Sequence, residues 1–248
     1  MPLKLDIAPN RKTSGLAAAK HAAKLLRQTL KEKGSASIIV ATGASQFDTL
    51  EAFLQEPDIA WENVTAFHLD EYVGIAITHP ASFRKYLWER FHQKLPLPLK
   101  AFHYIDGTGD AQAECKRLGN IIAQHPIDIC FAGIGENSHL AFNDPPADFQ
   151  TEAPYLVVNL DEACRRQQLG EGWFPNLDAV PKQAISMSIR QIMKSKTLII
   201  TVPDERKAAA VQKTVEGPVT PMVPASIMQQ HADVTLYLDA PAASLLKK

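Results

Sequence analysis

Residues 37–42 read SIIVAT, and the small-residue turn Gly43-Ala44-Ser45 follows them directly. A short run of β-branched and apolar residues that ends in a glycine turn is typical of a strand buried on both faces. The next residues, 45–55, place Phe47, Leu50, Phe53 and Leu54 at helical spacing, and Pro57 stops that helix. This stretch therefore predicts one strand-then-helix unit of an α/β fold.

The same unit recurs along the chain. Apolar runs predict strands over 64–70, 101–105, 127–135, 197–202 and 234–239, and periodic segments predict helices over 82–91, 111–124 and 204–213. Strands that alternate with helices indicate a sheet covered on both faces. We therefore predict an α/β fold with three layers, a mostly parallel open sheet and helices on both faces, in a Rossmann-like arrangement.

Two expectations concern the parts of the chain outside these strands. Ser14 is expected to cap a helix that runs to about Lys33 and ends at Gly34, with Leu16, Leu25, Leu26 and Leu30 on its buried face. The stretch 144–181, rich in proline and glycine, is expected to be a long loop region within the domain. With no internal repeat or linker, residues 1–248 are predicted to form a single domain.

The composition and charge of the chain exclude several classes of protein. The chain has 248 residues, 46% of them hydrophobic, and a formal net charge of −1, which lacks the basic footprint of a nucleic-acid binder. No apolar run is long enough for a membrane span, and the N-terminus does not resemble a signal peptide. The three cysteines form no CxxC pair, so neither a disulfide framework nor a zinc site is indicated. A reduced cytoplasm is the simplest compartment.

Open parallel sheets bind ligands beyond the carboxyl ends of their strands. The first such end carries Thr42, Gly43, Ala44 and Ser45, and backbone N–H groups at a helix start suit a phosphate. The alternative is an ordinary strand-to-helix turn with Ser45 as its N-cap. A Walker A loop is excluded, because no Gly-Lys-Ser/Thr follows.

The second strand end carries two adjacent carboxylates, Asp70 and Glu71, after His68. Buried carboxylates are costly unless they are used or paired. The i, i+2 spacing of His68 and Asp70 is expected to place both on one sheet face. Solvated loop acids and a metal site remain alternatives, although two ligands without a third are a weak metal signal.

The third and fourth strand ends supply a histidine and a lysine. His139 lies in the glycine-rich loop 133–144, close in sequence to Asn137 and Asp144, which favours a proton-transfer role. Lys207 lies in the first turn of a predicted helix, where an anionic ligand would offset the unfavourable dipole. The alternative is a solvated lysine paired with Asp204. Together the strand ends suit proton transfer on a phosphorylated small molecule.

Four segments resemble the glucosamine-6-phosphate deaminase/isomerase family, which is related to the 6-phosphogluconolactonases. They are ATGAS at 41–45, FHLDEYVG at 67–74, FAGIGENSHLAFNDP at 131–145 and TVPDERK with its continuation at 201–231. The resemblance implies aldose–ketose isomerisation with deamination, in which glucosamine 6-phosphate and water give fructose 6-phosphate and ammonium. It implies no cofactor and a sugar phosphate as the small-molecule partner. With the composition above, we expect no bound metal and neither nucleic acid nor membrane as a partner.

The resemblance also implies roles for individual residues. Asp70 would move the proton between C2 and C1, and His139, oriented by Asp144, would open the sugar ring. Thr42–Ser45 and Lys207 would hold the phosphate.

This chain departs from the family pattern at three places. Asn137 stands where the family often has Asp. Asp144 stands where it usually has Glu, so its contact with His139 is expected to need a water or a backbone shift. The family's phosphate-binding Arg cannot be aligned uniquely, which leaves Arg165 and Arg166 as candidates.

Three other functions stay open at this point. A galactosamine-6-phosphate deaminase differs at one hydroxyl, a 6-phosphogluconolactonase shares the scaffold, and a sugar-phosphate sensor would bind without turnover. The continuation of the histidine loop as HLAFND is similar to the deaminase pattern rather than the lactonase pattern. A homo-oligomer is compatible with the sequence.

Overall fold

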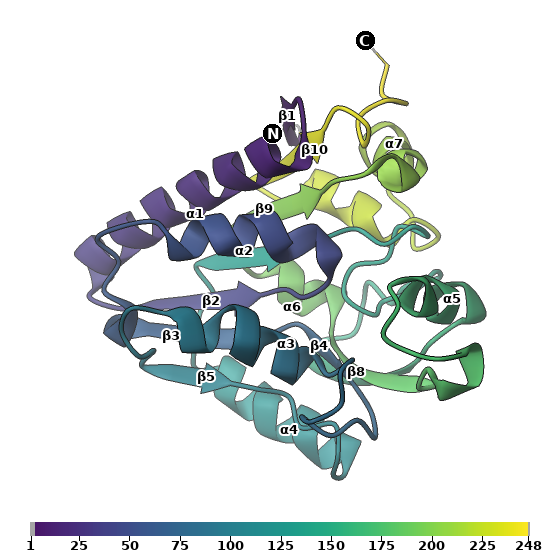
Figure 1. Ribbon diagram of the computed structural model, residues 1–248, viewed down its shortest axis with the longest axis horizontal. Helices are drawn as coiled ribbons and strands as arrows, with labels where there is room; N and C mark the ends of the chain where they lie inside the picture. Colours follow the sequence, from purple (N-terminus) through teal and green to yellow (C-terminus); the bar gives the residue numbers. More distant parts are fainter. Residues whose placement is uncertain (1–2, 248) are drawn as a thin grey trace.

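A seven-stranded sheet forms the centre of the molecule, and every neighbouring pair in it is parallel (Figure 1). The computed structural model describes residues 3–247. The strand order is β1-β10-β9-β6-β2-β3-β5. The strands of this sheet are β1 (Lys4–Ala8), β2 (Ala36–Val40), β3 (Val64–His68), β5 (Ala101–His103), β6 (Ile129–Ala132), β9 (Thr197–Val202) and β10 (Val234–Asp239).

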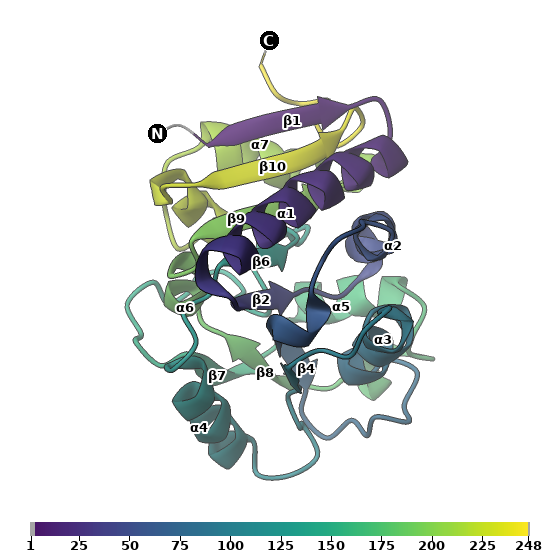
Figure 2. The ribbon, with the colours of Figure 1, turned by 90° about the vertical axis from the view of Figure 1, so that its left-hand side faces the viewer.

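Helices cover the sheet from both sides, so the predicted three-layer α/β fold is confirmed. In Figure 2, α2 and α3 lie on one side of the sheet and α4 and α6 on the other. Among residues 3–247, no helix has the length and apolar character that crossing a membrane requires. The helices are α1 (Arg11–Lys33), α2 (Phe47–Leu54), α3 (Phe83–Arg90), α4 (Ala111–Ile122), α5 (Glu162–Gly170), α6 (Ile189–Met193) and α7 (Ala208–Glu216).

The predicted start of α1 is wrong, its predicted end at Lys33 and Gly34 is confirmed, and its predicted buried face is confirmed only in part. Asn10, not Ser14, caps the helix, because its side chain accepts a hydrogen bond from Thr13 N. Leu16 is 42% exposed, and the fully buried stripe is largely alanine. Small residues let α1 lie close to its neighbours: a Cβ added at Gly15 would lie 2.8 Å from Asp48 Cβ of α2. Close helix packing therefore selects small side chains over most of this face, whereas Leu26 is fully buried and Leu25 and Leu30 pack against the core as predicted.

The expectation of a long loop over 144–181 is also wrong in part. This stretch contains β7 (Tyr155–Asn159) and α5. β7 pairs with β8 (Gln183–Met187), which pairs with β4 (Asp70–Tyr72), and these three strands make a small antiparallel sheet. The second sheet and α5 provide one wall of the pocket described below.

Candidate active site

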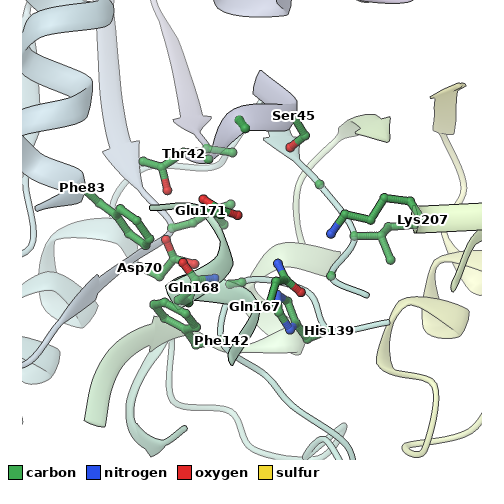
Figure 3. Close-up of a pocket in the computed structure, with 18 of the residues that line it drawn as sticks. Thr42, Ser45, Asp70, Phe83, His139, Phe142, Gln167, Gln168, Glu171 and Lys207 are labelled. Atoms are coloured by element: carbon green, nitrogen blue, oxygen red, sulfur yellow. The ribbon is translucent and has the colours of Figure 1, made fainter. Parts of the chain in front are cut away.

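The pocket lies where three parallel strands end, as the topology predicts. It is lined by residues that follow β2, β6 and β9, and it opens to solvent (Figure 3). The opposite wall comes from β4, α5 and the start of α3. The predicted residues that line it are Thr42, Gly43, Ala44, Ser45, Asp70, His139 and Lys207.

The turn after β2 is shaped by glycine. Gly43 has φ +91°, a conformation that residues with a Cβ rarely adopt, and Tyr86 Oη donates to its carbonyl at 3.1 Å. The chain continues through a 3-10 turn, Ala44–Gln46, into α2. Ser45 makes no capping hydrogen bond to α2, so the alternative of Ser45 as an N-cap is wrong. Its hydroxyl instead faces the pocket and accepts from Gln46 Nε2 at 3.1 Å (Figure 3).

Lys207 carries a buried ammonium group at this end of the pocket. The residue is 6% exposed, and no ion pair or hydrogen bond of its side chain occurs among residues 3–247. The alternative pairing with Asp204 is therefore wrong, and the Asp204 carboxylate lies 3.7 Å from Arg11 Nη1 instead. Burial lowers the pKa of Lys207 to about 8, against the opposing effect of nearby carboxylates such as Glu136. An anion bound here would favour the charged form.

Asp70 carries a buried carboxylate at the other end. It is 7% exposed and accepts no hydrogen bond in the described part of the chain. Burial, followed by the charge of Glu71, raises the pKa of Asp70 to about 8. His68 does not share its face: the chain leaves the parallel sheet after His68, and Asp70 begins β4 of the second sheet. The expected i, i+2 arrangement is therefore wrong, and only Asp70 lines the pocket.

Glu71 points away from the pocket and is fully buried. Its carboxylate accepts hydrogen bonds from Ser82 Oγ, Phe83 N and Arg84 N at 2.9–3.2 Å, and from the adjacent Tyr72 N at 2.9 Å. Three of these donors belong to the first turn of α3, so Glu71 satisfies the free N–H groups of a helix start. Two adjacent acids therefore have different surroundings, one without donors and one saturated with them.

His139 fits its loop because a glycine leaves room for it. A Cβ added at Gly135 would lie 2.4 Å from atoms of the imidazole ring. Ser138 and Ala141, on either side of His139, have φ of +70° and +52°, which turn this loop sharply. The histidine is 7% exposed and reaches the pocket from below Lys207 in Figure 3.

Asp144 supports His139 directly. Its Oδ1 lies 3.1 Å from His139 Nδ1, so the expected bridging water is not needed, although the pair is not aligned as a hydrogen bond. Asn137 joins the two, because its Nδ2 donates to Asp144 at 2.9 Å and its Oδ1 accepts from His139 N at 3.1 Å. Burial acts to raise the pKa of Asp144, but the contact with His139 and the Asn137 amide hold it below its usual value. The geometry thus keeps Asp144 ionised beside the imidazole.

A single group of three metal-ligating side chains occurs within residues 3–247: His139, Asp144 and Cys164, whose ligand atoms lie within 4.8 Å of one another. It includes neither His68 nor Asp70, so nothing in the geometry favours the metal site that the sequence left open at those residues.

Arg165 and Arg166 are not brought to the pocket. Arg165 donates to the carbonyls of Leu177 and Val180, and Arg166 pairs with Glu162 on the surface of α5. The arginine that does line the pocket is Arg206, which the sequence reasoning missed. Its position next to Lys207 at the end of β9 is the signal that could have found it.

The remaining missed residues come mainly from α5 and from two aromatic positions. The residues in and after α5 could not be found from strand ends, because α5 is not expected from the sequence. They are Phe83, Phe142, Gln167, Gln168 and Glu171.

The fold and the pocket define an α/β protein with a ligand site across the carboxyl ends of its parallel strands. Residues 9–237 match the model of the family described as glucosamine-6-phosphate isomerases/6-phosphogluconolactonase. The chain therefore belongs to that family.

Individual relatives agree with this assignment. A glucosamine-6-phosphate deaminase of Streptococcus pneumoniae is 40% identical over 232 residues, which cover 91% of this chain and 94% of that protein. The structure described as a monomeric glucosamine-6-phosphate deaminase has a TM-score of 0.90 and 32% identity, covering 98% of this chain and 100% of its own. A 6-phosphogluconolactonase from Shewanella baltica shares the fold with a TM-score of 0.80 at 16% identity, covering 96% of this chain and 98% of its own.

Proposed function

We propose that this protein is a glucosamine-6-phosphate deaminase, which converts glucosamine 6-phosphate and water to fructose 6-phosphate and ammonium. One observation carries the proposal. Asp70 and Lys207 are buried in the same pocket, and each lacks a hydrogen-bond or ion-pair partner among residues 3–247. Buried charges without partners are costly, which is expected where a ligand supplies the partner. The names of the relatives at 40% and 32% identity support the same activity.

The proposed mechanism assigns the phosphate to the end of the pocket where β2 and β9 finish. The Lys207 ammonium and the turn Thr42–Ser45 would hold it, and Arg206 would add a second positive charge at the rim. The phosphate is remote from the reacting carbons, so its binding energy serves to orient the sugar.

The proton transfers are assigned to the other groups of the pocket. His139, held beside the ionised Asp144, would take the C1 hydroxyl proton and deliver a proton to the ring oxygen as the pyranose opens. Asp70 would then take the proton from C2 and return it to C1, while one proton of the C2 ammonium passes to O1, through an enediol-like intermediate in which the amine is on C2. Hydrolysis of the resulting C2 imine releases ammonium and leaves the ketose.

We also propose that residues 1–248 act as one domain and that the protein works in the cytoplasm without a second copy. The N-terminal strand β1 pairs with β10 near the C-terminus, which supports one folding unit. The three cysteines are free, and the structural relative at 32% identity is described as monomeric. Ultracentrifugation of the active enzyme at assay concentration tests the last point.

The decisive experiment is an assay of ammonium and fructose 6-phosphate with the purified protein and glucosamine 6-phosphate. Galactosamine 6-phosphate and 6-phosphogluconolactone are tested in parallel. We expect turnover of the gluco epimer with kcat/KM well above that of the galacto epimer, and no lactone hydrolysis above the spontaneous rate. Lactone hydrolysis without ammonium release would overturn the proposal in favour of a lactonase, and binding without any turnover would favour a sensor.

A further inference from the structure

Glu171 places a carboxylate in the pocket in addition to Asp70, and the proton transfers described above do not use it. It follows α5 directly, and its side chain extends into the same cavity as Asp70 (Figure 3). No lysine or arginine nitrogen forms an ion pair with it in the part of the chain that the structure describes. Burial raises the pKa of Glu171, while Lys207, Arg206 and His139 oppose that effect. A carboxylate therefore lies within electrostatic reach of both ends of the pocket.

The position of Glu171 is fixed by the residues that precede it. Gln168 Oε1 accepts a hydrogen bond from Tyr72 Oη at 2.7 Å, and Gln167 Oε1 accepts from Glu136 N at 3.0 Å. The first of these contacts ties α5 to β4, and the second ties it to the loop that carries His139. Glu171 is thus presented to the pocket by a helix anchored on both sides.

A carboxylate at this place is unfavourable for a sugar phosphate that has no amine. The phosphate brings two negative charges into a pocket that already contains Asp70 and Glu171, and like charges repel strongly where water is excluded. An amino sugar phosphate differs, because the ammonium group on C2 supplies a positive charge next to the carbon on which Asp70 is proposed to act. Lys207 and Arg206 lie at one end of the pocket, where the nearby Asp204 carboxylate is 3.7 Å from Arg11 Nη1, and the carboxylates of Asp70 and Glu171 have no such cation within residues 3–247. This arrangement has the charge pattern that a zwitterion requires.

We propose that Glu171 binds the C2 ammonium group of the substrate and so selects amino sugar phosphates over sugar phosphates without an amine. This inference rests on the proposed function and assigns one of its specificity determinants. Glu171 contacts the substrate in the ground state, so its contribution is expected mainly in KM.

A different role for Glu171 would be to tune Lys207 through space, and the chain offers a matched control for that role. The Glu136 carboxylate also acts electrostatically on Lys207 and lies 3.5 Å from Arg206 Nη1, but it does not line the pocket. Glu171→Gln and Glu136→Gln each remove one negative charge near the same two cations. Only the first removes a negative charge that faces the pocket and could pair with the ammonium group.

The test compares an amino ligand with a ligand that has a hydroxyl at C2. KM for glucosamine 6-phosphate and the competitive Ki of glucose 6-phosphate are measured for the wild type and both variants. We expect Glu171→Gln to raise KM for the amino sugar by about tenfold or more, since a charge-assisted hydrogen bond is lost. Its Ki for glucose 6-phosphate should stay within about twofold or become lower, because a repulsive charge is removed. Glu136→Gln should change both constants by the same factor.

Equal changes in both constants for Glu171→Gln, or an unchanged KM, would overturn the inference. Failure of the proposed function gives a different result, because the wild type would then release no ammonium at all. In that case calorimetry with the same two ligands still measures the preference for the amine, and equal affinities of the wild type for both would overturn the role of Glu171. Thermal unfolding of each variant verifies that the substitution leaves the fold intact.

Discussion

The two walls of the pocket differ in how they are built. The strand-end wall consists of the turns after β2, β6 and β9, where backbone geometry dominates and glycines at 43 and 135 make the shape possible. The second wall consists of β4, α5 and the start of α3, where side chains dominate and Asp70 and Glu171 lie. The first wall is suited to a phosphate group, which many sugar phosphates share. The second wall contains the carboxylates that would distinguish one sugar phosphate from another. The parallel sheet thus supplies the contacts suited to any phosphorylated ligand. The second wall, built from β4, α5 and the start of α3, supplies the contacts that would distinguish one such ligand from another.

The largest expected effect belongs to the second wall. Asp70→Asn keeps the size of the side chain but cannot accept the C2 proton, so kcat for ammonium release should fall by about 10²–10⁴. KM should change little, because the phosphate contacts lie on the other wall. Exchange of the C2 hydrogen with solvent deuterium should fall in parallel with kcat. Ammonium release at the wild-type rate would refute the proton-transfer assignment.

Glu71, the neighbour of Asp70, should matter for the stability of the fold, whereas Asp70 should matter for activity. Glu71→Ala leaves the buried Ser82 hydroxyl and the partly buried N–H groups of Phe83 and Arg84 without an acceptor, and we expect a loss of about 3 kcal/mol in the free energy of unfolding. Asp70→Asn should leave stability unchanged or raise it, because it removes a buried charge that has no donors. Urea denaturation of both variants at pH 7 makes the comparison, and equal losses would contradict it.

The pH profile of kcat/KM is expected to depend on one ionisable group from each wall, Asp70 and Lys207. Asp70 must be ionised to act as a base, and its raised pKa of about 8 makes the rate increase with pH up to that value. Lys207 must be protonated to bind phosphate, and its lowered pKa of about 8 makes binding weaken above it. We therefore expect a narrow bell centred near pH 8.

Lys207→Ala separates the two limbs of that bell. Loss of the ammonium should raise KM by about tenfold or more at pH 7 with a smaller change in kcat. The alkaline limb assigned to Lys207 should disappear, and the acid limb assigned to Asp70 should remain. Persistence of an unchanged alkaline limb in Lys207→Ala would assign that limb to another group.

The strand-end wall could be predicted from the sequence, and the second wall largely could not. The strands over 197–202 and 234–239 were predicted with their observed bounds, because continuous apolar runs mark strands buried on both faces. In α5 the sequence EACRRQQLG is mostly polar, and its buried face contains Cys164 and Gln168, so hydrophobic periodicity gives little signal. Partly exposed strands such as β7 are similarly weak in pattern.

The difference in sequence pattern between the two walls explains which site residues the sequence predicts. Asp70 was identified because it directly follows a buried strand, although the turn into β4 that separates it from His68 was not foreseen. Glu171 was missed because its place depends on how α5 packs against Tyr72 and the histidine loop, which are distant in sequence. Local pattern predicts regular elements, whereas a residue held by long-range contacts needs the tertiary structure.

The smallest expected effects concern two arginines. They test whether an arginine that lines the pocket affects substrate binding more than one that lies outside it. Arg206 lines the rim with a side chain that is 43% exposed, whereas Arg166 pairs with Glu162 outside the pocket. Arg206→Ala should raise KM by only about two- to fivefold, because charges at an exposed rim are screened by water and salt. The effect should shrink further as the ionic strength is raised from about 0.01 M to about 0.5 M, since the Debye length shortens to a few ångströms. Arg166→Ala should leave KM within about twofold of the wild type at every salt concentration, since its surface ion pair contributes little. If Arg166→Ala raised KM more than Arg206→Ala did, α5 would have to turn its outer face to the substrate, and the division of the pocket into two walls would need revision.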